Sequence, residues 1–425
     1  MVWPAIKLCG FGCHVAGASN EAALSDHGLA MIASSIEAVG HRVQLIDLRG
    51  LKGWPDFEAA ILGTDYDVAC IGFHSVDEEP ARKAVETMKR LKPDKPVIAG
   101  GIHLSITHAR FPPADCVVYG EGDFLIRELL FNIEHHEPIP EAVSATPIED
   151  LDVLPVMDRT IFNQSVENGS PFPPGMPQPF FTMVLSRGCW YKKCVFCYET
   201  NTTTPRYRLR SPEKCIAEIK SLKAGSIMFH DDIFPHKAWC EKFVQLWKEA
   251  GIPRTPFWTQ MRADQICKSP ETIELLAEIG LTWVSLGVES GSQRMLDFLG
   301  KGTTVEMNKK SIQILHENNV NCWCNLVFGL PTETVEDIQA TIKLLEETRP
   351  AFYSLSTYTC YPGSKLYKYC EENKLFLDEH YSMARYPYER KISGVDYNYL
   401  RKTFGHIGGH LKGPMREWKP KEKTG

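Results

Sequence analysis

Apolar runs with the length of β-strands alternate with helical segments along most of this 425-residue chain. The alternation occurs in two series, which are separated by a proline-rich stretch at residues 139–179. Strands that alternate with helices predict parallel sheets with helices on their faces, because each parallel connection has to cross back over the sheet. A chain of this length also exceeds one ordinary hydrophobic core. The sequence therefore predicts an α/β protein with two parallel sheets and a linker between them.

The first series, residues 1–138, predicts a doubly wound, Rossmann-like parallel sheet. Two of its apolar runs contain two glycines each, "PVIAGGIHLS" at 96–105 and "CVVYGEGD" at 116–123. Three further strands are predicted at 5–12, 41–48 and 67–75, and two helices at 25–40 and 81–93. Ligands of such sheets bind at the carboxyl ends of the strands. We therefore expect a binding site beside Gly100 and Gly101.

The second series predicts a partial barrel over residues 180–370. Six strands are expected, at residues 180–186, 226–232, 256–264, 282–290, 321–329 and 352–360. Six β/α units are two fewer than the eight that close a barrel, so the sheet should stay open along one side. Cys322 and Cys324 point to the same side of their strand, either into the core or into the lumen. Residues 371–425 are expected to form a small C-terminal cap or tail.

Composition excludes several classes of protein. The formal net charge is −6, so a broad basic field is lacking and nucleic acid is not an expected partner. No apolar run is long enough to span a bilayer, and the N-terminus lacks the pattern of an export signal. We therefore expect a cytoplasmic protein, in which the 14 cysteines are reduced rather than paired in disulfides.

Three cysteines lie close together directly after the first strand of the second series. Cys189, Cys194 and Cys197 follow the spacing Cys-x4-Cys-x2-Cys within "SRGCWYKKCVFC". A zinc site usually needs further ligands some distance away, and a redox Cys-x-x-Cys would leave Cys189 without a purpose. A four-iron cluster ordinarily takes four thiolates, so three leave one iron open to a substrate or cosubstrate. The alternative is three packed thiols without a metal.

The second series resembles the radical S-adenosylmethionine (SAM) superfamily over about residues 178–370. The resemblance rests on "SRGC…CVFC" and on four later segments in the same order, "FHDDIF" (229–234), "GVESGSQRML" (287–296), "VFGLPTET" (327–334) and "YPGSKLY" (361–367). It implies a [4Fe–4S] cluster on the three cysteines, SAM on the fourth iron, and an external one-electron reductant of the flavodoxin or ferredoxin type. The usual first spacing in the superfamily is x3, so this chain carries one additional residue within "WYKK".

The same resemblance implies which residues contact SAM. They lie in the cysteine loop or at the ends of predicted strands, the edge at which barrels of this kind bind their ligands. The matching positions are Phe196 and Gly329 near the adenine, Glu289 and Ser290 near the ribose and carboxylate, and His230 and Asp232 near the amino-acid moiety.

Residues 22–125 resemble the cobalamin-binding domain that precedes the radical SAM barrel in one large subfamily. The matching segments are "HGLAMIASSIEAVGHRVQLID" (27–47), "VIAGGIHLS" (97–105) and "CVVYGEGD" (116–123). The resemblance implies bound cobalamin, with Ser75, Gly100, Gly101 and Glu121 as the expected contacts. The alternative is a domain that packs against the barrel without a corrin.

Some cobalamin proteins offer a histidine to cobalt through an Asp-x-His-x-x-Gly sequence, which this chain lacks. Asp26-His27-Gly28 has the residue types with a different spacing. Cys9 and Cys13 flank a glycine-rich turn near the expected corrin and form another candidate pair for cobalt.

Polar residues at strand ends are candidates for catalysis. Asp231, Arg262 and Tyr358 each lie near the end of a predicted barrel strand. Asp231 is a candidate acid or base. Arg262 and Asp264 are candidates to clasp a polar substrate, and Tyr358 to flank it.

Together the resemblances imply a cobalamin-dependent radical SAM enzyme. We expect it to generate a 5′-deoxyadenosyl radical and to methylate an unactivated carbon of a small molecule or peptide. A first alternative keeps both cofactors and closes a ring or rearranges a skeleton without methyl transfer. A second is an iron–sulfur or zinc-binding module for electron transfer or assembly. The motifs describe cofactors, and none describes the substrate.

Overall fold

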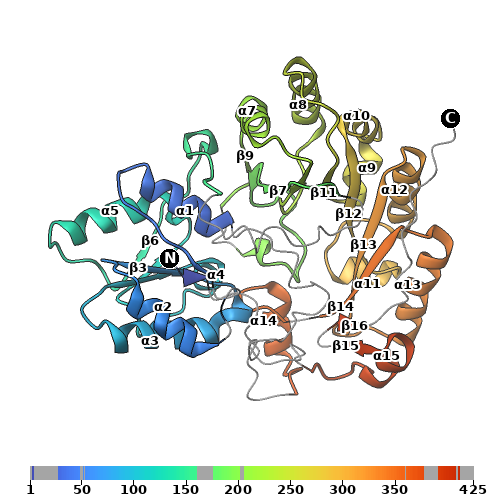
Figure 1. The fold of residues 1–425 in the computed structure, drawn as a ribbon. Coiled ribbons are helices and arrows are strands. Elements are labelled where there is room, and N and C mark those ends of the chain that lie inside the picture. Colours follow the sequence, from blue (N-terminus) through green and yellow to red (C-terminus); the bar gives the residue numbers. More distant parts are fainter. Residues whose placement is uncertain are drawn as a thin grey trace.

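The computed structural model describes residues 2–3, 27–47, 51, 53–159, 176–201, 205–358, 360–377, 391–407 and 410–411. Two sheets organise the chain, each flanked by helices (Figure 1). The predicted strand at 5–12, with Cys9, and the second cobalt candidate Cys13 lie outside the described residues. Within those ranges, every helix is too short or too polar to cross a membrane.

The N-terminal sheet has six parallel strands in the order β2-β1-β3-β4-β5-β6. Their bounds are β1 Val2–Trp3, β2 Ile46–Asp47, β3 Ala69–Gly72, β4 Val97–Gly100, β5 Cys116–Tyr119 and β6 Ala142–Ser144. The order reverses between β1 and β3, and ligands of doubly wound sheets bind at the carboxyl ends of such strands. The predicted fold class is thereby confirmed. β6 lies in the stretch predicted as a linker and pairs with β5, so the sheet extends beyond the predicted strands.

Helices cover both faces of this sheet. α1 (His27–Glu37) and α5 (Gly122–Glu134) pack together on one face, and α2 (Trp54–Gly63) and α3 (Glu78–Leu91) on the other. The strand predicted at 96–105 ends earlier, because Gly101 turns the chain into α4 (Ile102–Thr107). Gly101 has a φ of 104°, and a Cβ there would lie 2.6 Å from the backbone nitrogen of Phe73. Only glycine fits this turn.

The second sheet has eight strands in the order β15-β16-β14-β13-β12-β11-β10-β7. Six of them are parallel, β7 Phe180–Met183, β10 Ser226–Phe229, β11 Phe257–Met261, β12 Leu281–Glu289, β13 Asn321–Phe328 and β14 Phe352–Thr357. Among the described residues β7 pairs only with β10, so the barrel is open there, as predicted. β15 (His406–Ile407) and β16 (His410–Leu411) join antiparallel beside β14. Part of the predicted C-terminal cap therefore extends the barrel sheet.

Helices follow the strands of this sheet, and several of them cover its outer side (Figure 1). Their bounds are α7 Pro212–Leu222, α8 Lys237–Glu249, α9 Ala263–Lys268, α10 Glu271–Ile279, α11 Gln293–Phe298, α12 Val305–Glu317, α13 Val335–Thr348, α14 Lys365–Glu372 and α15 Tyr397–Phe404. Ser211 caps α7 as its sequence predicts, and Thr334 and Asp337 form a capping box on α13. Cys322 and Cys324 are buried in the core with these helices, so packing explains both.

Candidate cofactor sites

The cysteine loop begins where β8 (Ser186–Arg187) leaves the edge of the barrel. The carboxylate of Asp231, directly after β10, accepts hydrogen bonds from the backbone nitrogens of Leu185 at 2.9 Å and Ser186 at 2.6 Å. Asp231 is buried, and burial raises its pKa to about 7. Its carboxylate is occupied by the backbone of the neighbouring segment, so the predicted acid–base role is not supported. Asp231 instead fixes the start of the loop.

The three cysteines gather at the carboxyl end of the barrel strands, and all are partly exposed. The backbone nitrogen of Cys189 donates to the carboxylate of Glu199 at 3.0 Å, and that of Cys197 donates to the carbonyl of Cys194 at 3.0 Å. Burial raises the pKa of Cys194, and the charge of Cys189 adds to this effect. Burial likewise raises the pKa of Cys197, with a contribution from Cys194. Backbone hydrogen bonds therefore hold both ends of the loop that carries the three thiols.

A left-handed residue lies in the lengthened part of the loop between Cys189 and Cys194. Lys192 has a φ of 48°, and its ammonium donates to the carbonyl of Pro205 at 2.7 Å. The neighbouring Tyr191 donates from its hydroxyl to the carbonyl of Gly300 at 2.9 Å. The longer spacing thus folds back onto the protein rather than projecting from it.

Two buried cations lie beside Cys194. Nη1 of Arg262 is 3.7 Å from its Sγ, and Nη2 donates to the carbonyl of Lys301 at 2.7 Å. The ammonium of Lys301 pairs with Glu289 at 2.8 Å. Burial alone would lower the pKa of Lys301, but the charges of Glu289 and Cys194 outweigh it and raise that pKa. Nearby cations stabilise thiolates, so this environment fits an anionic, thiolate-ligated cluster.

Arg262 and Asp264 were predicted to clasp a polar substrate. The structure pairs them with each other, Nε to Oδ1 at 2.9 Å. The guanidinium carbon of Arg262 also lies 3.6 Å from the centre of the Tyr191 ring. Arg262 therefore packs between the cysteine loop and the barrel, and its contacts support the loop rather than a substrate.

Two predicted SAM contacts, Glu289 and Ser290, stand at the end of β12. Glu289 has a φ of 62°, which is uncommon for a residue with a side chain and costs about 1–3 kcal/mol. Such strain gathers at ligand sites. Ser290 is buried, and its hydroxyl lies 3.3 Å from that of Thr341 and accepts from the backbone nitrogen of Ser292 at 3.1 Å. Its hydroxyl therefore holds the turn that presents Glu289.

The turn after β13 contains a carboxyl group that the sequence analysis did not identify. The backbone nitrogen of Gly329 donates to Oε2 of Glu333 at 2.6 Å. Burial raises the pKa of Glu333 to about 8, and its Oε1 has no hydrogen-bond partner within the described residues. A carboxyl that is neutral near pH 7 can donate a hydrogen bond to a ligand. The signal was a glutamate four residues after the glycine in "GLPTET".

The other SAM candidates lie in the same region, whereas one catalytic candidate is part of the core. His230 is exposed at the end of β10, and Asp232 accepts from the hydroxyl of Tyr198 at 3.0 Å. Phe196 packs against an apolar cluster that includes Tyr358. Tyr358 is buried, and its hydroxyl lies 3.2 Å from Sγ of Cys360. The predicted contact of Tyr358 with a substrate is therefore not supported.

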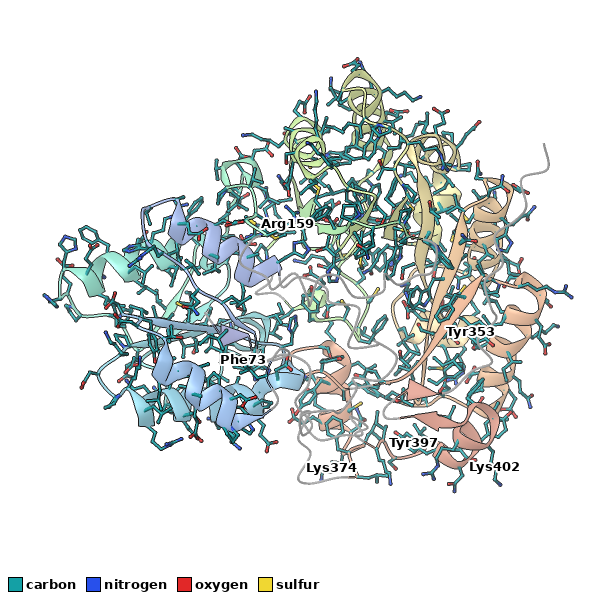
Figure 2. The ribbon with its side chains drawn as sticks, viewed as in Figure 1. Phe73, Arg159, Tyr353, Lys374, Tyr397 and Lys402 are labelled. Atoms are coloured by element: carbon teal, nitrogen blue, oxygen red, sulfur yellow. The ribbon has the colours of Figure 1, made fainter. Side chains whose placement is uncertain are left out.

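A cavity of about 390 Å³ lies between the carboxyl edge of the N-terminal sheet and the start of the cysteine loop. Gly100 and Gly101, two of the predicted cobalamin contacts, are part of its wall, and much of the remaining wall is apolar. Ser75 is not among the lining residues, and its hydroxyl lies 2.9 Å from Nδ1 of His103. Figure 2 labels two lining residues, Phe73 beside the N-terminal sheet and Arg159 nearer the barrel.

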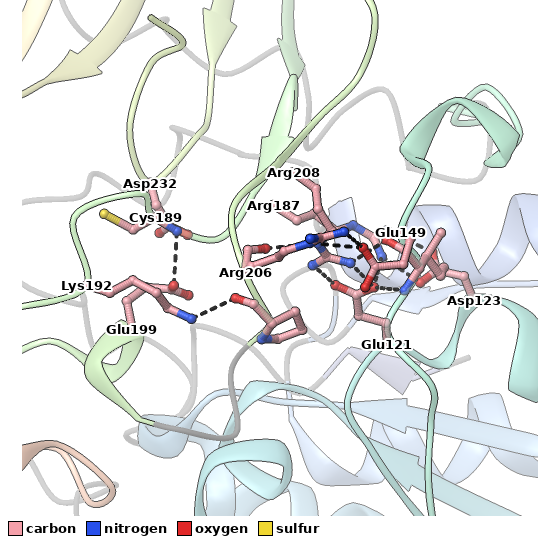
Figure 3. Close-up of polar contacts among 12 residues, drawn as sticks. Glu121, Asp123, Glu149, Arg187, Cys189, Lys192, Glu199, Arg206, Arg208 and Asp232 are labelled. Atoms are coloured by element: carbon pink, nitrogen blue, oxygen red, sulfur yellow. Dashed lines mark hydrogen bonds and ion pairs between the residues drawn. The ribbon is translucent and has the colours of Figure 1, made fainter.

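Ion pairs join the N-terminal sheet to the strand that leads into the cysteine loop (Figure 3). Arg187 donates to both oxygens of Asp123, each at 2.9 Å. Arg208, on β9 (Arg208–Leu209) beside β8, donates to Glu121 at 2.8 Å. Burial alone would raise the pKa of Glu121, but the hydrogen bond from Arg208 and the charge of Arg187 outweigh it and lower that pKa. Glu121 was predicted to contact cobalamin; it lines the cavity, but its carboxylate ties the two sheets together.

Three arginines at or beside this interface, Arg206, Arg208 and Arg210, were not predicted from the sequence. They occur at every second position, which is the period of a strand, and so share one face. Arg206 pairs with Glu149 and Arg208 with Glu121, both of which precede the barrel in the chain, whereas Arg210 pairs with Glu218 on α7 of the barrel itself. The alternation in "RYRLR" was therefore a readable signal of an ion-paired edge.

A histidine pair lies where the cavity meets the barrel. His27 begins α1 and lines the cavity, and its ring centroid is 6.0 Å from that of His230. Burial lowers the pKa of His27 to about 3, and the charges of His230 and Arg159 act in the same direction. The imidazole of His27 is therefore neutral at physiological pH.

Among the residues that the structure describes, no three His, Cys, Asp or Glu side chains are grouped as ligands of a single metal ion. A four-iron cluster differs, because each thiolate binds a different iron. The cations beside Cys194 fit such a cluster, and the largely apolar cavity at the carboxyl edge of the N-terminal sheet fits an extended flat ligand.

Comparisons with known families agree with this geometry. The model of the B12 binding domain matches residues 13–130, and the model of the Radical SAM superfamily matches residues 183–345. The chain carries a B12-binding domain followed by a radical SAM domain. A radical SAM domain implies a [4Fe–4S] cluster and SAM, and a B12-binding domain implies cobalamin, so the predicted cofactors are confirmed at this level.

Solved and curated proteins resemble this chain over much of its length. The radical SAM methyltransferase TsrM from Kitasatospora setae, with cobalamin and a [4Fe–4S] cluster bound, has the same fold, with a TM-score of 0.70 at 16% identity over 97% of this chain and 83% of that one. An uncharacterized methyltransferase of Pyrococcus horikoshii is 27% identical over 82% of this chain and 79% of its own. The anaerobic magnesium-protoporphyrin IX monomethyl ester cyclase of Rubrivivax gelatinosus is 27% identical over 68% of this chain, which spans 55% of the cyclase.

Proposed function

We propose that the protein is a cobalamin-dependent radical SAM methyltransferase that methylates an unactivated carbon. The observation that carries the proposal is the shared wall of the cavity. Gly100 and Gly101 at the edge of the N-terminal sheet form one part of it, and Ser186 and Arg187, which lie two to three residues before Cys189, form another. A corrin in the cavity and a cluster in the cysteine loop would face a common space, in which a methyl group can reach a substrate carbon.

The residues of the chain divide this work between holding and positioning. When bound, the cluster and SAM supply a radical that activates the substrate, and cobalamin supplies the methyl group. Cys189, Cys194 and Cys197 would hold the cluster through three of its irons, and Arg262 offsets the negative charge that they bring. Among the predicted SAM contacts, Glu289 combines backbone strain with an ion pair to Lys301, and the strain supports a place for it at a ligand site. The apolar wall of the cavity keeps water from the reacting groups.

Cobalamin itself provides a test that needs no knowledge of the substrate. Anoxically reconstituted protein is mixed with reductant, cobalamin and SAM that carries a deuterated methyl group. We expect deuterated methyl on the corrin by mass spectrometry, together with 5′-deoxyadenosine. Cys194→Ala is the matched variant and should lose 5′-deoxyadenosine, whereas Cys240→Ala, a buried core cysteine, should retain it. Absence of both products in the parent protein would refute the proposal.

A second function is supported by one specific observation, the identity with the cyclase over 68% of this chain. A ring-forming enzyme would use the same two cofactors without passing a methyl group to its substrate. Formation of 5′-deoxyadenosine without label on the corrin would favour this alternative. An electron-transfer module would bind no SAM at all, and titration calorimetry with SAM separates it from both enzymes.

A further inference from the structure

One nitrogen donor stands out among the residues that line the cavity. The wall contains His27, His74, Arg159, Arg187 and Arg210. The arginines remain protonated in proteins and have no lone pair to offer a metal. The side chain of His74 is 63% exposed and lies 3.9 Å from Asp77. His27 differs, because its Nε2 is buried and has no hydrogen-bond partner within the described residues.

A buried imidazole nitrogen without a partner is costly, and native structures seldom leave one unexplained. Burial disfavours the cationic form of His27, and the charges of His230 and Arg159 act in the same direction, so the ring is neutral. In the tautomer with its proton on Nδ1, Nε2 offers a lone pair at the wall of the cavity. A hydroxyl or water can share such a lone pair, and so can a metal with an open axial position.

The strand order places His27 at the carboxyl edge of the N-terminal sheet, where sheets of this kind bind their ligands. His27 is the first residue of α1, the helix that connects β1 with β2. The strand order reverses at β1, so the N-terminus of α1 lies at the crevice where doubly wound sheets bind their ligands. The same crevice carries Gly72, Gly100 and Gly120, which line the cavity at the ends of β3, β4 and β5.

We propose that Nε2 of His27 is an axial ligand of the cobalt in bound cobalamin. The inference rests on cobalamin occupying this cavity and adds the identity of its protein ligand. The neutral imidazole donates its lone pair and replaces water or the nucleotide base of the cofactor, so no proton is released and no electron is transferred. The spacing of Asp26-His27-Gly28 departs from the cobalt-binding sequence of other cobalamin proteins, so this ligand is reached from a helix start rather than from that motif.

Electron paramagnetic resonance of the cob(II)alamin form gives a direct test. An axial nitrogen couples to the unpaired electron, and natural-abundance nitrogen splits each cobalt line into a triplet. Full-length protein without an affinity tag is prepared with [15N]histidine and loaded with unlabelled cobalamin. We expect the triplets to become doublets, which the nucleotide base of unlabelled cobalamin cannot produce. Triplets that persist in the protein labelled with [15N]histidine, or cobalt lines without nitrogen splitting, would overturn the inference.

Two variants complete the experiment. His27→Gln should lose the nitrogen splitting, and His74→Gln, at the other histidine of the wall, should keep it. Corrin content is measured for each protein by its visible spectrum, so ligation is separated from binding. If the parent protein binds a full complement of corrin but shows no coupling to histidine nitrogen, the proposed function stands and the assignment of His27 as ligand is wrong. If the parent protein binds no corrin, both the proposed function and the ligand assignment are wrong.

Discussion

Breaking the ion pair between Arg208 and Glu121 should show how much this contact between the N-terminal sheet and the barrel contributes to the stability of the protein. The two side chains are 4% and 14% exposed, so Arg208→Met leaves a carboxylate buried beside fewer donors. Breaking a buried pair costs about 3–5 kcal/mol. Glu121 keeps the backbone nitrogen of Ile148 at 2.9 Å and Arg187 at 3.5 Å, which places the cost near the lower end, about 3 kcal/mol.

For a chain of this length that loss corresponds to a fall of about 3 °C in the melting temperature. The assay is differential scanning calorimetry at pH 7, where Glu121 is ionised because its pKa is lowered. The matched control is Arg206→Met, two residues away, whose pair with Glu149 is 78% and 61% exposed. An exposed pair contributes at most about 1 kcal/mol, so this variant should melt within about 1 °C of the parent. Equal shifts in the two variants would refute the argument from burial. Adding Glu121→Gln to Arg208→Met should recover part of the loss, because it removes the stranded charge.

Three further predictions concern the cofactor sites. Cys194→Ala should bind far less iron and sulfide than the parent after anoxic reconstitution, and a full complement would contradict the cluster assignment; Cys240→Ala is the control. Arg262→Gln should lower the reduction potential of the reconstituted cluster in a redox titration, because a cation 3.7 Å from Cys194 favours the more negative, reduced state; an unchanged or higher potential would contradict this. Glu333, whose pKa is raised to about 8, binds more protons folded than unfolded, so its contribution to stability falls as the pH rises from about 4.5 to 8. Glu333→Gln removes that loss, so the difference in melting temperature, variant minus parent, should increase from pH 4.5 to pH 8. A difference that stays constant over this range would show that Glu333 is already ionised in the folded protein.

The sequence allowed the six barrel strands to be located because each is an apolar run followed by a helix of regular period. β12 and β13 begin and end within one residue of their predicted ranges. The strand at 96–105 was predicted too long, since apolar residues continue from β4 into α4 and only the turn at Gly101 separates them. β6 was missed because its three residues lie in a proline-rich stretch.

Site residues were predictable where a motif carries them and not where a distant partner decides their role. The cysteine loop was found from spacing alone. Asp231 and Tyr358 were assigned to catalysis from their places at strand ends, but hydrogen bonds to Ser186 and Cys360 use their polar atoms inside the protein. Glu121 was assigned to cobalamin, and its partner Arg208 is 87 residues further along the chain. No local pattern around Glu121 could have revealed that pairing.

Arg187 is only two residues from Cys189, and this short tether has a mechanical consequence. The side chain that clamps the N-terminal sheet through Asp123 belongs to the same few residues that present the first thiol. A movement of the N-terminal sheet away from the barrel would therefore displace the thiol of Cys189 relative to those of Cys194 and Cys197. We therefore expect the separation between the cavity and the cysteine loop to change little while the pair between Arg187 and Asp123 is intact.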